Sequence, residues 1–231
     1  MKHFRSKVIN NIKLNSRYYH IFFKVLDSNF IFKAGQYTLV KINGKTYRPY
    51  SIASTPKKLP FWEIILDASP GGIGSTYLKN LKKEAVIRTL KPSGTLYFNN
   101  DNSNNIITIT SGCGIASIKS IIEDVLENKQ TSIYLLWGLR NKKDIFLTKE
   151  FTKWKKHNPK FSWQISLSHP TKNYVGKKGY VHKHLSGLLK STNYSNTSLY
   201  LCGSKEMINK SHDILKQINF PLEKVYFEKY Y

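Results

Sequence analysis

The stretch "TYRPYSIAST" (residues 46–55) brings three chemically different side chains close together. Arg48 carries a planar and permanently charged guanidinium, Tyr50 an aromatic ring and Ser51 a hydroxyl. Lysine outnumbers arginine in most other parts of the chain, so an arginine at this point is unusual. We interpret the combination as part of a flavin nucleotide site, and the other motifs of the chain test this hypothesis.

A second stretch, "TSGCGIAS" (residues 110–117), could bind a phosphate group through its backbone. Gly112 and Gly114 would let a phosphate approach closely, and the free N–H groups at the start of the following helix would attract it. A G-x-G pattern alone is a weak signal, because a tight turn from a strand into a helix explains it about equally well.

The stretch "SPGGIGSTYLKNL" (residues 69–81) is another glycine-rich segment. Its glycines precede Ser75 and Thr76, either of which could cap a short helix. Taken alone, an ordinary flexible turn before a helix explains the segment too. The residues that could form a second anion site here are Gly71, Gly72, Gly74, Ser75 and Thr76.

Small or polar residues also follow three later apolar runs of the chain. In open parallel sheets, ligands bind beyond the carboxyl ends of the strands, where loops lead into helices. Several such strand ends together predict a crevice for a dinucleotide. The residues at these ends are Gly138, Arg140, Ser168, His169, Pro170, Cys202, Gly203 and Ser204.

The elements that must position Arg48 and its neighbours are short β segments. Runs rich in aromatic and β-branched residues indicate strands. Asn43-Gly44 between two such runs predicts a two-residue hairpin, since both positions tolerate positive φ. Several short antiparallel strands of this kind predict a small barrel. The runs cover residues 18–25, 37–42, 46–53 and 61–66.

Beyond the polar stretch "NNDNSNN" (99–105), apolar runs alternate with helical patterns. This alternation predicts a parallel sheet covered on both faces. We therefore expect a β-barrel over residues 1–100, a linker over 101–105 and an α/β domain over 106–231. The expected strands are 106–112, 132–139, 161–168, 198–203 and the terminal "KVYFEKYY", and the expected helices cover about 118–126, 146–154 and 205–217.

The bulk properties limit the class of protein. The 231 residues are 40% hydrophobic and carry a formal net charge of +23. A strongly basic chain could bind nucleic acid, but the lysines are scattered and no five basic residues are consecutive. We therefore regard nucleic acid as unlikely, and we favour a generally basic solvated surface over a docking surface for an acidic protein.

Compartment and metal content can also be predicted. No run approaches the roughly 20 apolar residues that a transmembrane helix needs, and the N-terminus lacks the apolar region of a secretory signal. Cys113 and Cys202, the two cysteines, cannot form a disulfide framework or alone ligate zinc or an iron–sulfur cluster. We expect a cytoplasmic protein with no metal and two reduced thiols.

Taken together, these motifs resemble the ferredoxin–NADP reductase superfamily, whose members pair an FAD-binding β-barrel with a nicotinamide-binding α/β domain. Nine pieces match in order across nearly the whole chain, which makes the resemblance specific. They are "FKAGQYTLV", "RPYSIAS", "GGIGSTYL", "KPSGTLYF", "TSGCGIAS", "LLWGLRNKKDIF", "LSHP", "LYLCGSKEM" and "VYFEKYY".

The resemblance implies roles for the residues of the barrel. Arg48, beside Pro49, would pair with the flavin pyrophosphate. Tyr50 would pack against the isoalloxazine and the ribityl chain, and Ser51 would hydrogen-bond flavin N5, the atom that receives hydride. The residues that would close on the pyrophosphate are Gly72, Gly74, Ser75 and Thr76.

For the second domain, the resemblance implies that the "GCG" loop receives the pyrophosphate of NAD(P)H, with Arg140 near the same cofactor. Cys202, followed by Gly203, would touch the nicotinamide, Glu228 would lie beside the reacting rings, and Tyr230 or Tyr231 would cover the flavin. The residues of the loop are Gly112, Cys113 and Gly114. Cys113, Ser117 and Ser204 depart from the family, which usually has Thr, Pro and Pro at these positions.

The expected activity is that of a flavoprotein oxidoreductase, which transfers hydride from NAD(P)H to FAD and electrons onward to a separate carrier. We expect an acidic ferredoxin, a flavodoxin or an oxygenase component, since the chain lacks the four cysteines of an iron–sulfur module. The alternatives are a reductase of free flavin and a non-catalytic nucleic-acid-binding module. The choice between NADH and NADPH stays open.

Overall fold

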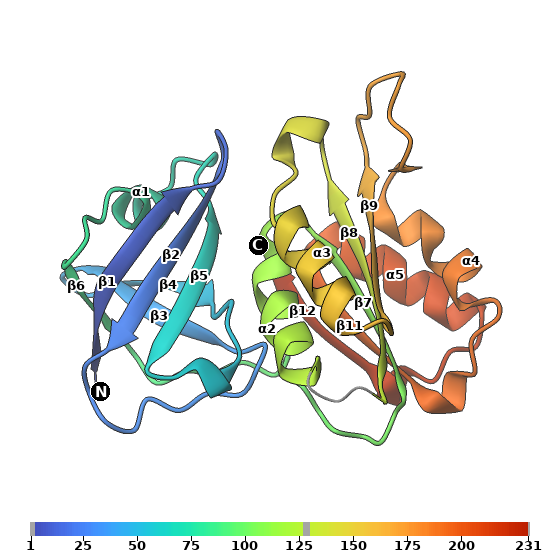
Figure 1. The fold of residues 1–231 in the computed structure, drawn as a ribbon, viewed down its shortest axis with the longest axis horizontal. Coiled ribbons are helices and arrows are strands. Elements are labelled where there is room, and N and C mark those ends of the chain that lie inside the picture. Colours follow the sequence, from blue (N-terminus) through green and yellow to red (C-terminus); the bar gives the residue numbers. More distant parts are fainter. Residues whose placement is uncertain (1–2, 127–129, 231) are drawn as a thin grey trace.

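The computed structural model describes residues 3–126 and 130–230, which form two six-stranded sheets side by side (Figure 1). The first sheet is antiparallel and the second is parallel with helices around it. This confirms the predicted fold class, a β-barrel followed by an α/β domain.

The first sheet has the strand order β4-β3-β6-β1-β2-β5. Its two edge strands, β4 and β5, come together at an isolated bridge between Ile52 and Ile64, which closes the sheet into a barrel. A short helix, α1, covers one end. The elements are β1 (Phe4–Lys13), β2 (Tyr18–Val25), β3 (Tyr37–Asn43), β4 (Thr46–Ser51), η1 (Pro56–Lys58), β5 (Phe61–Asp67), α1 (Ile73–Lys79) and β6 (Val86–Thr89).

The barrel strands match the predicted runs, with one correction and two omissions. The β3–β4 hairpin is present, but Asn43 still pairs with Thr46 as the last residue of β3, so the turn consists of Gly44, at φ +39, and Lys45. The predicted turn was therefore one residue too early. The sequence prediction also missed β1 and β6.

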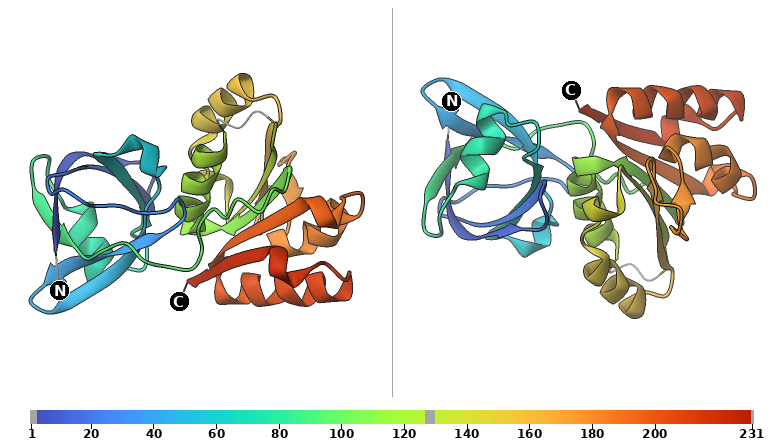
Figure 2. Two further views of the ribbon diagram at one scale, coloured as in Figure 1. Left: turned by 90° about the horizontal axis from the view of Figure 1, so that it is seen from below. Right: turned by 90° about the horizontal axis from the view of Figure 1, so that it is seen from above.

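The second sheet has the order β10-β9-β8-β7-β11-β12, and its neighbouring strands all pair in parallel. In Figure 2, α2 and α3 cover one face of this sheet, and α4 and α5 cover the other. The elements are β7 (Asn105–Ser111), η2 (Gly112–Gly114), α2 (Ile115–Val125), β8 (Ser132–Leu139), η3 (Lys142–Asp144), α3 (Thr148–His157), β9 (Phe161–Leu167), β10 (Lys177–Lys178), η4 (Val181–His184), α4 (Leu185–Leu189), η5 (Tyr194–Asn196), β11 (Thr197–Ser204), α5 (Lys205–Gln217), η6 (Leu222–Lys224) and β12 (Val225–Tyr230).

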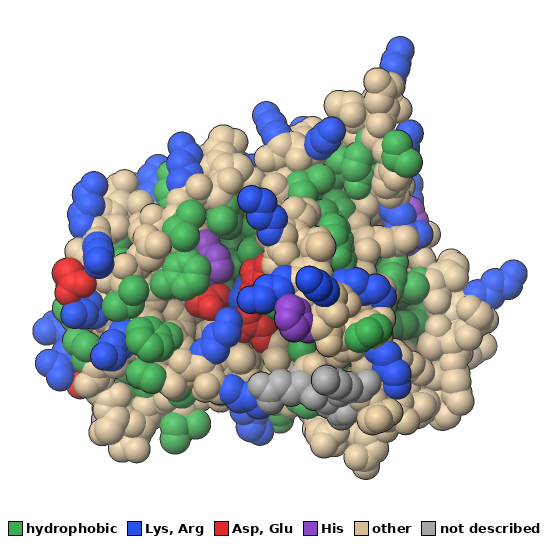
Figure 3. All heavy atoms as spheres, in the orientation of Figure 1, with side chains coloured by type: hydrophobic (Ala, Val, Ile, Leu, Met, Phe, Trp, Pro, Cys, Tyr) green, Lys and Arg blue, Asp and Glu red, His purple; other side chains and the backbone are tan. Residues whose placement is uncertain are grey.

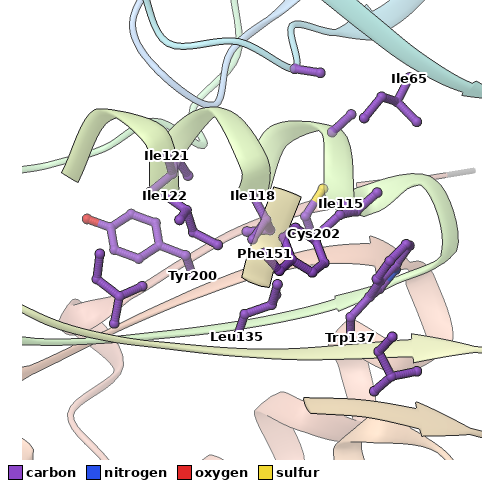
Figure 4. Close-up of a cluster of buried hydrophobic side chains, with 14 of the residues drawn as sticks. Ile65, Ile115, Ile118, Ile121, Ile122, Leu135, Trp137, Phe151, Tyr200 and Cys202 are labelled. Atoms are coloured by element: carbon purple, nitrogen blue, oxygen red, sulfur yellow. The ribbon is translucent and has the colours of Figure 1, made fainter. Parts of the chain in front are cut away.

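Helix α2 lies between the barrel and the parallel sheet and packs against both. Its isoleucines fill the space above β8 and β11, as Figure 4 shows for Ile118 and Ile122. The same core cluster includes Tyr18, Ala53 and Ile65 from the barrel. Since one apolar core spans the two halves, their relative position is fixed by packing and not by the linker alone.

Among the described residues, no helix is long and apolar enough to cross a membrane.

Candidate functional site

A cleft of about 210 Å³ lies where four loops leave the carboxyl ends of the parallel strands. One loop follows each of β7, β8, β9 and β11, so the convergence predicted from the small residues at the strand ends is present. His169 bonds to Ser168 over 3.0 Å and is not part of the lining. The lining from these four strand ends and their loops includes Ser111, Gly112, Gly138, Arg140, Ser168 and Ser204.

The barrel closes one side of this cleft with two residues that the sequence prediction missed. Arg17 lies over the ring of Tyr18, with its guanidinium carbon 5.1 Å from the ring centroid, and forms an ion pair with Asp67. Tyr18 in turn packs against Phe146 of the α/β domain. No sequence motif marks Arg17 and Tyr18, because their place at the cleft follows from how the two halves pack.

The Gly112–Gly114 loop forms a single 3₁₀ turn between β7 and α2. Gly112 has φ +53, a conformation that favours glycine, and it lines the cleft. A Cβ at Gly114 would overlap the carbonyl oxygen of Cys202 and lie 2.6 Å from Oγ1 of Thr110. Close packing of the loop onto β11 therefore explains why residue 114 is a glycine. Gly112, in contrast, is free to face a ligand.

The thiol of Cys113 does not point into the cleft but toward the barrel, where it donates to the carbonyl oxygen of Ile65 over 3.0 Å. Burial raises the pKa of this thiol. Cys113 is therefore a protonated thiol at neutral pH, and it joins the loop to β5.

On the barrel, the "RPYS" strand and the "GGIG" loop lie against each other. A Cβ at Gly74 would come within 2.5 Å of the Tyr50 hydroxyl and 2.9 Å of Cγ of Arg48. Glycine is therefore required where α1 crosses β4. The exposed guanidinium of Arg48 donates to the carbonyl of Tyr47 and forms no ion pair with a carboxylate among the described residues, so it can receive an anion.

The prediction that Ser75 or Thr76 caps the helix after this loop is wrong. Gly72 is the N-cap of α1 and supplies no side chain, whereas Ser75 and Thr76 lie inside the helix. Their hydroxyls donate back to the loop, from Ser75 to the carbonyl of Gly72 over 3.0 Å and from Thr76 to that of Gly71. The reason is positional, because a cap must precede the first helical residue.

The two halves meet at Ser51, the last residue of β4, and Tyr230, the last of β12. The two hydroxyls are 2.6 Å apart, and Ser51 is otherwise buried. The ring of Tyr230 also packs against the buried cluster that contains Cys202. Ser51 and Cys202, from the two halves of the chain, therefore both lie near Tyr230. Tyr231 lies outside the described residues.

Cys202 and Glu228 are neighbours in the parallel sheet, since β11 and β12 pair Cys202 with Glu228. Figure 4 shows Cys202 on the sheet side of α2, close to Ile115. Burial raises the pKa of the Cys202 thiol to about 12, and the nearby Glu228 carboxylate contributes. Next to it, Gly203 is packed against the Ser111 side chain, where a Cβ would overlap the hydroxyl.

Glu228 carries a carboxyl group whose pKa lies close to neutral pH. Burial raises the pKa of its carboxyl to about 7. One of its oxygens, Oε2, is buried and has no hydrogen-bond partner among the described residues. An unsatisfied buried oxygen of this kind can accept a hydrogen bond from a ligand.

These features define a class of protein that pairs a β-barrel with a parallel α/β domain and has its candidate site between the two. Two family models match the chain, an oxidoreductase FAD-binding domain over residues 5–98 and an oxidoreductase NAD-binding domain over residues 108–213. The chain therefore belongs to the ferredoxin–NADP reductase superfamily, as its motifs predicted.

Individual relatives agree with this assignment. The ferredoxin–NADP reductase B of Sorangium cellulosum is 24% identical over 210 residues, which are 87% of this chain and 86% of the relative. Reductase component 1 of terephthalate 1,2-dioxygenase from Comamonas sp. is 32% identical over 138 residues, and the match spans 59% of this chain and 41% of that protein. The matched segment thus spans well under half the length of the Comamonas relative.

A solved structure has the same fold. The ferredoxin NADP⁺ reductase of Neisseria gonorrhoeae with bound FAD and NADP superposes with a TM-score of 0.86 over 99% of both chains, at 18% identity.

The residues of this structure fit both cofactors. The exposed Arg48 guanidinium can receive a phosphate. Because residue 74 is a glycine, the loop at the start of α1 can lie close to Tyr50. The strand-end cleft offers Gly112 and Arg140 to a second nucleotide. Within the described residues, no cluster of three or more His, Cys, Asp or Glu side chains could hold a metal ion.

Proposed function

We propose that the protein oxidises NADH or NADPH with FAD bound to the barrel, and passes the electrons to a separate carrier protein. When bound, FAD supplies the chemistry, because it accepts a hydride and releases electrons one at a time. The single observation that supports this best is the position of Tyr230, whose hydroxyl bonds to that of Ser51 and whose ring packs against the cluster that contains Cys202. It brings a barrel strand end and a sheet strand end to the same point.

In this proposal the barrel residues hold the flavin nucleotide. Arg48 binds the pyrophosphate, for which a planar cation with several donors is well suited. Tyr50 packs against the ring system, and burial already raises the pKa of its phenol to about 12, so that it stays neutral. Pro49 lies between these two residues in β4. The loop residues that close on the phosphates are Gly72, Gly74, Ser75 and Thr76.

The nicotinamide nucleotide occupies the strand-end cleft. Gly112 and Arg140 line that cleft and bind its phosphates, with Cys113, Gly114 and Gly203 shaping the loops beneath. Ser51, Cys202 and Glu228 surround the place where the two rings meet. Tyr230 lies over Ser51 and must move aside before a nicotinamide ring can reach it.

The electron acceptor that we propose is an acidic carrier such as a ferredoxin, a flavodoxin or an oxygenase component. A net charge of +23 would steer a negatively charged partner toward the protein and raise the association rate. The two cysteines of these 231 residues cannot hold an iron–sulfur cluster by themselves, and in this proposal the partner carries such a cluster. A reducing compartment such as the cytoplasm suits the two thiols.

Purification followed by flavin analysis tests the proposal. We expect a yellow protein that keeps FAD on dialysis, reduces ferricyanide with NADH or NADPH, and reduces a ferredoxin. A colourless protein that is active only with added FMN would instead indicate a reductase of free flavin. Absence of flavin binding together with tight, salt-sensitive RNA binding would indicate a nucleic-acid-binding module.

A further inference from the structure

Three consecutive residues of the barrel, just after β4, each bond to helix α2. The carbonyl of Ala53 accepts from Nζ of Lys119 over 3.1 Å, and that of Ser54 accepts from Oγ of Ser120 over 2.6 Å. The amide of Thr55 donates to Oε2 of Glu123 over 3.1 Å. We call residues 53–55 and the α2 side chains bonded to them the seam.

Lys119 is the buried cation of the seam. Its side chain is only 1% exposed, and its ammonium group contacts Oε2 of Glu63 at 2.8 Å and Oε1 of Glu123 at 2.6 Å, in addition to Ala53. An ammonium has three protons, so all three are used. Two of the acceptors belong to the barrel and one to α2.

The charges around Lys119 make a compact network. Lys58 pairs with both Glu63 and Glu123, at 3.2 and 2.8 Å, and His20 contacts Glu63 at 2.9 Å. Glu150 of α3 approaches Lys119 at 3.3 Å. Figure 3 shows acidic side chains gathered between the two halves of the molecule, with cationic side chains around them. The network therefore crosses the boundary between barrel and sheet.

The network holds Lys119 in its charged form. Burial alone would lower the pKa of Lys119, but the Glu123, Glu63 and Glu150 carboxylates outweigh that effect and raise it. Burial alone would likewise raise the pKa of Glu63, yet His20 and Lys119 keep it well below its usual range.

Along the chain, the seam follows closely after the residues that the proposed function places around the two rings. Ala53 is two residues beyond Ser51, and α2 starts straight after the Gly112–Gly114 loop. Lys119 is five residues beyond Gly114, which is about 7.5 Å along a helix. One ammonium group thus connects the flavin-side strand end with the helix that carries the nicotinamide-side loop.

Stability alone does not account for a buried charge network. Desolvation of buried charges offsets much of their attraction, and apolar residues often serve as well or better. Hydrogen-bonded charges also fix the relative position and orientation of the groups that they join. Hydride transfer is sensitive to this positioning, since a displacement of about 1 Å can cost about 100-fold in rate.

We propose that Lys119 is a positioning residue for hydride transfer, which sets the approach of the nicotinamide ring to the flavin by fixing residues 53–55 against α2. This inference rests on the proposed function. Lys119 touches neither cofactor in this account. It acts through the backbone of Ala53 and through Glu63 and Glu123.

The test compares Lys119→Met with Lys119→Arg in the FAD-loaded protein. Met keeps most of the stem but removes the ammonium, whereas Arg keeps a cation with several donors. The matched control is Lys7→Met, which removes an ion pair between β1 and the exposed Glu84. Anaerobic stopped-flow absorbance gives the flavin reduction rate, the nicotinamide Kd and the long-wavelength charge-transfer band.

For Lys119→Met we expect flavin reduction at least about tenfold slower at saturating NAD(P)H, with a weaker charge-transfer band and a Kd within about threefold of wild type. Lys119→Arg should recover most of the rate, and Lys7→Met should match wild type. Hydrogen exchange of the Thr55 amide should accelerate in Lys119→Met alone. If that variant does not load FAD, Ser120→Ala takes its place, with an expected slowing of about threefold.

Two results would overturn the proposal. One is a Lys119→Met protein that melts at lower temperature but reduces its flavin as fast as Lys7→Met, because Lys119 would then only stabilise the fold. The other is unchanged hydrogen exchange at Thr55. If neither NADH nor NADPH reduces the flavin of the wild-type protein, the proposed function fails instead, and the exchange measurement still tests whether Lys119 fixes the seam.

Discussion

The hydroxyl of Ser51 lies 2.6 Å from the hydroxyl of Tyr230, so the last residue of a barrel strand bonds to the last residue of the parallel sheet. These residues are 179 positions apart in sequence. Burial raises the pKa of the Tyr230 phenol well above its usual value, which keeps it a neutral hydrogen-bonding group. The contact puts an aromatic ring where the proposed function requires the nicotinamide ring.

Replacing Tyr230 should therefore strengthen nicotinamide binding. In Tyr230→Ser the bound nucleotide no longer competes with a ring over Ser51, and we expect the Kd for NAD(P)⁺ to fall by about tenfold, which is about 1.4 kcal/mol. Equilibrium titration followed by the flavin absorbance measures this Kd. Phe227→Ser, a change at an exposed residue of the same strand, is the control. Equal or weaker binding in Tyr230→Ser would show that the ring does not block the site.

Glu228 should make both rate and stability depend on pH near neutrality. Its folded pKa, about 7, is raised above the usual 4.5 by burial, so the folded state favours the protonated carboxyl. The stability from this group is complete below about pH 4.5 and is lost as the pH rises through about 7. We expect Glu228→Gln to reduce the difference in unfolding free energy between pH 5 and pH 8 by about 2 kcal/mol.

Urea unfolding at the two pH values measures this difference. Glu223→Gln, at an exposed position in the preceding 3₁₀ turn, is the control and should leave the difference unchanged. The pH profile of flavin reduction should also lose an inflection near pH 7 in Glu228→Gln. A variant with the wild-type pH dependence of both quantities would mean that Glu228 is not the titrating group.

Strand and helix positions could be predicted well where apolar and β-branched residues cluster, as in β8 and α5. The missed strand β1 is different, since its second half is polar and mostly exposed. Asn11 belongs to it, and its amide donates to the carbonyls of Leu78, Lys79 and Leu81 at the end of α1. A polar residue with a distant partner gives no strand signal.

The cleft was predictable because strand ends of a parallel sheet converge by geometry. Lys119 was not, because in the sequence it resembles any solvated lysine of a helix. Its burial depends on Glu63 from the other half of the chain. Arg17 likewise reaches the cleft through barrel packing that no local pattern reveals.

Arg48 should contribute to FAD affinity more than to the fold. Its side chain is exposed and bonds to the carbonyl of Tyr47, so removing it leaves no buried group unsatisfied. We expect Arg48→Ala to bind FAD at least about tenfold more weakly, since a charge-assisted contact to a phosphate is worth about 1.5–3 kcal/mol. Arg88→Ala, at an exposed arginine on β6, is the control. Fluorescence titration of the apoprotein with FAD measures both Kd values, and equal values would exclude Arg48 from the phosphate site.

Electron transfer to an acidic ferredoxin should slow as the salt concentration rises. The 37 Lys and Arg residues against 14 Asp and Glu residues attract a negative partner at long range. Salt screens this attraction, with a Debye length of about 10 Å at 0.1 M. We expect the second-order rate constant to fall by about tenfold between about 50 and about 500 mM salt. Reduction of a neutral quinone by the same protein is the control and should change little. A ferredoxin rate that does not depend on salt would show that the basic surface does not steer the partner.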